Sequence, residues 1–101
     1  MGLFKNIKFA TDLKMALASV VSAQTDSQFE TALASAAHLA GSISSQWNRT
    51  RGMSGSAKDQ LFHIAVTIKV GKTLLDQNPG SVATIREPMN EAYLRLDSIY
   101  A

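Results

Sequence analysis

The 101-residue chain has no cysteine, two prolines, one tryptophan and a net charge of only +2. Without cysteine it has neither a disulfide framework nor thiolate ligands for a metal, so a reducing compartment, the cytoplasm, is the expected location. The small net charge does not indicate nucleic-acid binding unless basic residues cluster locally. No stretch approaches the roughly 18 consecutive apolar residues of a membrane span, so we expect no membrane partner.

Apolar residues recur in steps of three and four, which places them on one face of a helix. The clearest such stripe consists of Phe29, Leu33, Ala36, Ala40, Ile43 and Trp47. It is predicted to face a second set of core residues: Leu61, Ile64, Ile68, Leu75, Ile85, Met89 and Leu96. The predicted helices run from about Leu3 to Ala23, from Gln28 to Trp47, from Ala57 to Gln77, and from residue 82 to the end. The first of these could also begin later, near residue 11, leaving residues 2–10 as an arm.

Two short motifs predict where helices begin and end. Ser27-Gln28-Phe29-Glu30 matches a capping box, with Ser27 as the N-cap of the second helix. Asn78-Pro79-Gly80 stops the third helix, because proline cannot continue it and Asn78 or Gly80 can adopt a positive φ. Ser81 is then the predicted N-cap of the fourth helix.

The third segment has two interpretations. Leu61, Ile64 and Ile68 form one helical stripe, while Phe62 and Val66, with others, make the helix apolar nearly all round, a pattern typical of a buried helix. Residues 63–70 also alternate with period two and are rich in β-branched side chains, as in a strand. Its partner strand would be residues 3–9. A helix is preferred because a two-stranded sheet is marginally stable, and an α+β arrangement is the alternative.

Motifs for catalysis, metals and cofactors are weak. Gly71-Lys72-Thr73 resembles the end of a phosphate-binding P-loop, but Val66 occupies the position of the required first glycine. His38 and His63 have no second ligand or base three or four residues away. We therefore predict no catalytic residue, no metal ligand and no cofactor, and a protein that is not an enzyme.

One basic cluster accompanies the tryptophan, in the glycine-rich loop predicted over residues 48–58. It comprises Trp47, Arg49, Arg51 and Lys58. An aromatic ring beside arginines can stack a base and neutralise phosphates, so a nucleic-acid-binding helical protein is one alternative function. In the preferred interpretation, Trp47 closes the core and the arginines are solvated.

The exposed side of the fourth helix is the other predicted surface for binding a partner. Its candidate residues are Arg86, Tyr93, Arg95 and Tyr100. Tyrosine and arginine are enriched among the residues that dominate protein–protein interfaces. Together with Trp47 and the basic loop residues, these form the predicted partner-binding set.

A further set of residues resembles a known family. The chain has about a hundred residues in two helical halves, a tryptophan near the centre, and Tyr93-Leu94-Arg95-Leu96-Asp97 near the end. In these respects it resembles the small secreted Trp-x-Gly effectors of bacterial type VII secretion, which implies export as a dimer of helical hairpins. The sequence departs from the family pattern at Trp47-Asn48-Arg49, which lacks the glycine, and at Pro79-Gly80 and Pro88, which interrupt the expected long second helix.

These observations predict one all-α domain over residues 1–101, either an antiparallel four-helix bundle or two packed helical hairpins. We predict a small non-enzymatic protein-binding module of the adaptor, inhibitor or immunity type, such as bacteria and phages encode. Its partner is another protein, or a second copy of the chain in a homodimer. The alternative hypotheses for the function are a nucleic-acid-binding helical protein and a small secreted effector.

Overall fold

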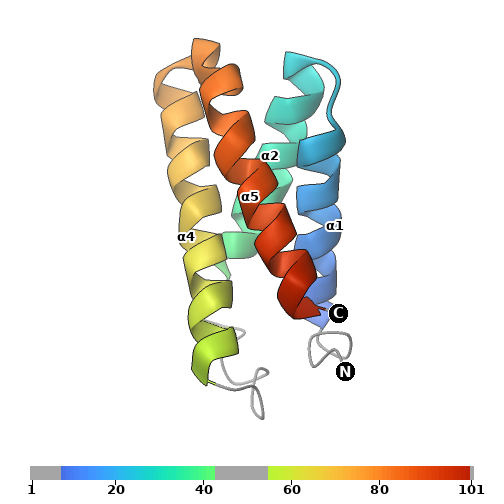
Figure 1. Cartoon of the computed structure of the whole chain (residues 1–101). Coiled ribbons are helices and arrows are strands. Elements are labelled where there is room, and N and C mark those ends of the chain that lie inside the picture. Colours follow the sequence, from blue (N-terminus) through green and yellow to red (C-terminus); the bar gives the residue numbers. More distant parts are fainter. Residues whose placement is uncertain (1–7, 43–54, 101) are drawn as a thin grey trace.

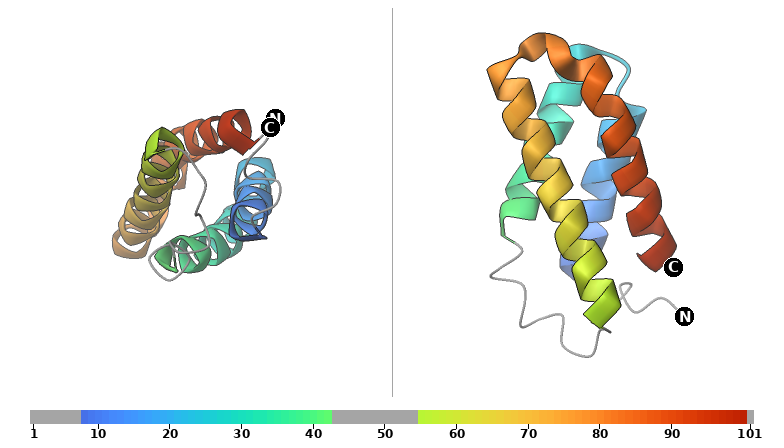
Figure 2. Two further views of the ribbon diagram at one scale, coloured as in Figure 1. Left: turned by 90° about the horizontal axis from the view of Figure 1, so that it is seen from below. Right: turned by 60° about the vertical axis from the view of Figure 1, so that its left-hand side comes forward.

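The computed structural model describes residues 8–42 and 55–100 (Figure 1). Its helices are α1 (Lys8–Ser22), α2 (Asp26–Gly41), α4 (Gly55–Gln77) and α5 (Val82–Tyr100), with the short 3-10 turn η3 (Pro79–Ser81) before α5. Seen along the bundle, α1, α2, α4 and α5 form a ring in which each helix runs antiparallel to its two neighbours (Figure 2). The prediction of an antiparallel all-α four-helix bundle is confirmed.

The core is built from one stripe of each helix, spaced by three and four residues. Leu13 and Leu17 of α1 belong to the same hydrophobic cluster as Phe29 and Leu33 of α2, and all four are fully buried. The second set of predicted core residues, from Leu61 to Leu96, is buried throughout. Of the first stripe, the part on α2 is buried, whereas Ile43 and Trp47 lie outside the described residues.

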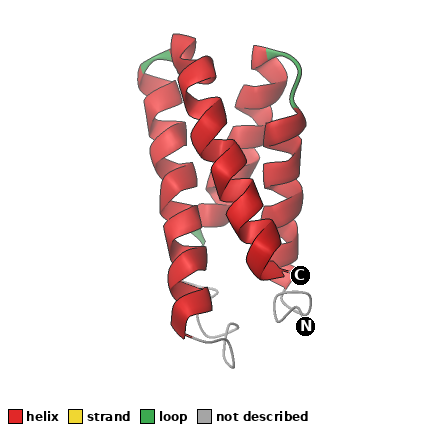
Figure 3. Cartoon of the chain, in the orientation of Figure 1, coloured by secondary structure: helices red, strands yellow, loops and turns green. Residues whose placement is uncertain are grey.

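The strand alternative for residues 63–70 is wrong, because all of them lie inside α4 and the described residues contain no strand (Figure 3). Residues 8 and 9, proposed as part of the partner strand, belong to α1. Both patterns coexist over residues 63–70, but only the helical one aligns Ile64 and Ile68 with the core side of a longer stripe beginning at Leu61. Burial of that stripe decides the conformation.

The N-cap of α2 lies two residues before Ser27, the predicted N-cap. Thr25, in extended conformation at φ −122°, is the N-cap, and its hydroxyl accepts a hydrogen bond of 3.1 Å from the Gln28 amide. The Gln28 side-chain oxygen in turn accepts a hydrogen bond of 3.0 Å from the backbone amide of Gln24. This start adds Asp26 to the first turn, where a negative charge stabilises the helix.

Thr25→Ala is therefore expected to lower the free energy of unfolding by about 1 kcal/mol, because the Gln28 amide loses its acceptor. Ser27→Ala is the matched control and is expected to change it by less than about 0.5 kcal/mol. Urea denaturation followed by circular dichroism measures both. A larger loss of stability for Ser27→Ala than for Thr25→Ala would contradict Thr25 as the N-cap and favour Ser27, the N-cap predicted from the sequence.

The other end of α2 also differs from the prediction, since the helix ends at Gly41 and not at Trp47. Ser42 closes the last turn: its amide donates to the Leu39 carbonyl oxygen at 3.1 Å and its hydroxyl donates to the same oxygen at 2.7 Å. A serine beside glycine competes in this way with continuation of the helix.

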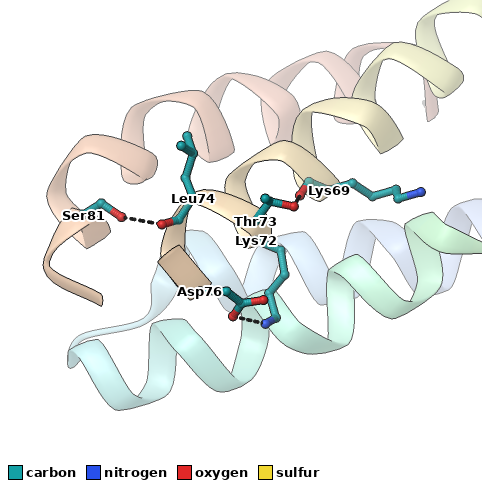
Figure 4. Close-up of polar contacts among 6 residues, drawn as sticks. All are labelled: Lys69, Lys72, Thr73, Leu74, Asp76 and Ser81. Atoms are coloured by element: carbon teal, nitrogen blue, oxygen red, sulfur yellow. Dashed lines mark hydrogen bonds and ion pairs between the residues drawn. The ribbon is translucent and has the colours of Figure 1, made fainter. Parts of the chain in front are cut away.

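The turn between α4 and α5 confirms the predicted stop after Gln77 but uses different backbone geometry. Asn78 is extended at φ −144°, and Gly80 has no positive φ either, so the predicted left-handed residue is absent here. Instead, the Asn78 side-chain oxygen accepts a hydrogen bond of 3.1 Å from the Gly80 backbone amide. The N-cap is Asn78 and not the predicted Ser81, which lies inside η3. The Ser81 hydroxyl donates to the Asn78 carbonyl oxygen at 2.7 Å and to the Leu74 carbonyl oxygen at 3.5 Å, the second of which is drawn in Figure 4.

Candidate functional site

A second apolar row on α4 faces outward. Phe62, Val66, Val70 and Leu74 follow one another at four-residue intervals and remain 50%, 42%, 52% and 46% exposed. We call these four residues the α4 apolar row. The expectation that this helix is buried all round is thus wrong. In a ring of four, α4 packs mainly against α2 and α5, so its core stripe is covered and the opposite row is not.

The α4 apolar row borders a shallow groove of about 340 Å³, lined by Val66, Val70 and Leu74 together with Lys69 and Thr73. The Thr73 hydroxyl donates to the Lys69 carbonyl oxygen at 3.0 Å and is therefore occupied by the helix backbone (Figure 4). The polar atoms at this face are thereby reduced mainly to the ammonium group of Lys69. The surface suits an apolar partner that also carries one polar or charged group.

The predicted binding residues of α5 differ in how far they reach solvent. The Arg86 guanidinium donates to the Ala23 carbonyl oxygen at 3.1 Å and lies 5.0 Å above the centre of the Phe29 ring, so it joins α5 to α2 and to the connection between α1 and α2. Tyr93 is half-buried against the core, and Arg95 is exposed. Tyr100 is the last residue of α5, and the structure describes its backbone only. Partner binding by these residues stays a prediction.

Most of the predicted basic cluster lies outside the described residues. Trp47, Arg49 and Arg51 lie outside the described residues, and Lys58 is half-buried near the start of α4. That helix begins at Gly55, so the last part of the predicted 48–58 loop is helical. Nucleic-acid binding through this cluster stays a prediction.

The three residues that resemble the end of a P-loop, Gly71-Lys72-Thr73, lie inside α4. Gly71 is a buried residue of α4, and a Cβ atom there would lie 2.9 Å from the Met89 Cε and 3.3 Å from the Ile85 Cγ2. Lys72 forms an ion pair with Asp76 one turn later (Figure 4). The glycine thus permits close approach of α5, and the helical backbone amides around it are not arranged to bind phosphate.

Tertiary contacts bring one histidine close to a carboxylate, a pairing that sequence spacing did not suggest. His63 of α4 and Glu91 of α5 line the same groove, together with Arg95. The groove measures only about 60 Å³, against several hundred Å³ for typical ligand pockets. His38 is exposed near the end of α2. Within the described parts of the chain, no group of three or more His, Cys, Asp or Glu residues could hold a metal.

The small residues of α2 contribute to a wider groove of about 540 Å³ against α1. Its lining is alanine and hydroxyl-bearing residues, with Gln28 as the exception. The Ser19 hydroxyl donates to the Met15 carbonyl oxygen at 3.3 Å, and the Ser22 hydroxyl donates to the Ser19 carbonyl oxygen at 3.4 Å. Both hydroxyls therefore bond to the backbone of their own helix. The groove therefore offers little directed chemistry.

The Tyr-x-x-x-Asp motif contributes to packing within the chain. Asp97 forms a 3.0 Å ion pair with Lys14 of α1, and Leu96 between the motif residues is fully buried. The described helices form two hairpins in one chain, α1–α2 and α4–α5, where the resemblance to the secreted effectors implies one hairpin per chain.

Comparison with protein-family models, with curated proteins and with solved structures found no match for this chain. Among the described helices, none has the length and apolar character needed to cross a membrane. The surface chemistry of the bundle is therefore the remaining indicator of function.

Proposed function

We propose that this protein is a non-enzymatic protein-binding module that docks a partner on the α4 apolar row. The exposure of four large apolar side chains in a single line carries this proposal. Isolated exposed apolar residues, such as Met15 on α1, are normal on protein surfaces. A continuous row of them has an unfavourable contact with water, and such patches commonly mark interaction sites.

The spacing of the row favours a protein partner. Side chains four residues apart form a ridge that fits into the groove between the ridges of another helix. Phe62 and Leu74 extend this ridge over more than three helical turns, which is the arrangement used when helices dock into apolar grooves. A rigid surface with this ridge and little directed chemistry suits an adaptor or inhibitor acting in the cytoplasm.

Val70→Asp tests the proposal because it places a charge in the middle of the row without entering the core. We expect the folded protein to lose at least about tenfold in affinity for its partner, the effect of removing one interface hot spot. Met15→Asp, on an exposed apolar residue of α1, is the matched control. Tagged wild type and both variants are compared by quantitative affinity capture from the native host, and captured proteins are then reconstituted from purified components.

The expected result is a purified partner that binds the wild type and Met15→Asp equally but binds Val70→Asp weakly. Circular dichroism should give matching melting curves for all three proteins. Equal binding of a reconstituted partner by Val70→Asp would contradict docking on this row and direct attention to Arg95 and the basic loop.

A further inference from the structure

One positive charge, Lys69, lies beside the α4 apolar row without a counter-ion from the described part of the chain. Lys69 is exposed and lines the same groove as Val66 and Val70. Its neighbour Lys72 is paired with Asp76, whereas the Lys69 side chain extends away from that pair (Figure 4). An occupant of the row therefore meets one unpaired ammonium group surrounded by aliphatic side chains.

A second copy of the chain does not satisfy this charge. In an antiparallel pairing that covers the whole row, Phe62 faces Leu74 of the second copy and Val66 faces its Val70. The midpoint is then residue 68, so the two Lys69 side chains approach each other across the symmetry axis. Like charges brought together in this way oppose association.

The acidic residues of α4 do not remove this conflict. Asp76 is already held by Lys72. Pairing Lys69 with Asp59 of a second copy moves the midpoint of an antiparallel pair to residue 64, so that Val70 faces Lys58 and Leu74 faces a position before the start of α4. An antiparallel pair of α4 helices can thus either cover the row or bring Lys69 to a carboxylate of α4, but it cannot do both. A parallel pair in register puts the two Lys69 side chains on opposite sides of the contact, away from the carboxylates of α4.

We infer that the partner is a different protein, which presents an amphipathic helix with aliphatic residues on one face and a Glu or Asp opposite Lys69. This inference rests on the proposed function of the α4 apolar row. The aliphatic face covers the row, and two ridges of four-residue spacing cross at about −50°. The carboxylate pairs with the ammonium group, which selects the partner and sets its register.

Two synthetic helical peptides test the inference. Both carry leucines at four-residue intervals, and they differ only at one central position on the edge of the leucine stripe, which is Glu in one and Lys in the other. Isothermal titration calorimetry at low salt is expected to show that the wild type binds the Glu peptide about tenfold more tightly, through one attraction gained and one repulsion avoided. Lys69→Glu is expected to reverse the preference. Lys72→Glu, at the lysine already paired within α4, is the matched control and should retain it.

The other outcomes separate the inference from the proposed function. If the wild type binds both peptides equally and Val70→Asp binds neither, the row docks helices without recognising charge, and the inference fails while the proposed function stands. If neither peptide binds and sedimentation shows a wild-type dimer that Val70→Asp dissociates, the occupant is a second copy and the inference is wrong. If neither peptide binds and the protein is a monomer, the inference is overturned, and the proposed function is decided by the reconstituted partner and Val70→Asp.

Discussion

Phe29→Ala is expected to lower the free energy of unfolding by about 3–5 kcal/mol, a large part of the stability of a domain of this size. Phe29 is fully buried on the core side of α2, where removing the ring leaves a cavity that its rigid neighbours fill only partly. The ring also supports the Arg86 guanidinium at 5.0 Å, so that contact between α2 and α5 is lost as well.

Phe62→Ala is the matched control, because it removes the same ring from a half-exposed position on the α4 apolar row. We expect it to cost less than about 1 kcal/mol, since much of the ring already contacts water. Chemical denaturation followed by circular dichroism compares the two. Similar losses for both variants would mean that α4 is more deeply covered than the fold indicates.

Gly71→Val is expected to cost about 1–3 kcal/mol through overpacking between α4 and α5. The first added atom would already lie 2.9 Å from the Met89 Cε and 3.3 Å from the Ile85 Cγ2. Both neighbours are buried and have little space to move away, so the helices must separate or strain their side chains.

Gly41→Val provides the comparison for Gly71→Val. Nothing lies within 4 Å of a Cβ built at Gly41, which is exposed at the end of α2. We expect the stability of this variant to stay within about 0.5 kcal/mol of the wild type. Thermal melts of the two valine variants would contradict the packing described here if Gly71→Val melted as high as Gly41→Val.

The helical core could be predicted because its information is local. Steps of three and four residues identify Leu33 or Ile85 as core residues whatever the helices pack against. The α2 cap was misplaced because two capping motifs overlap, one starting at Thr25 and one at Ser27. Both satisfy the same spacing rule, and the difference lies in backbone geometry that a spacing rule does not contain.

The candidate site was harder to predict because α4 carries two apolar rows of similar composition. Either the row containing Ile64 or the row containing Val66 could face a core, and the pattern predicted that both were buried. Contacts of Arg86 with Ala23 and of Lys14 with Asp97 join residues far apart in the chain, so no local pattern indicated them. Their partners depend on how the helices are arranged in the ring.

The order of residues alone specified four amphipathic segments and a stop after Gln77, because these follow from periodicity and turn chemistry within a few residues. Assembly of the bundle settled which face of each segment loses contact with water. It left Val66 and Val70 outside, with Lys69 beside them, since a helix in a ring of four has only two close neighbours and cannot bury its whole circumference.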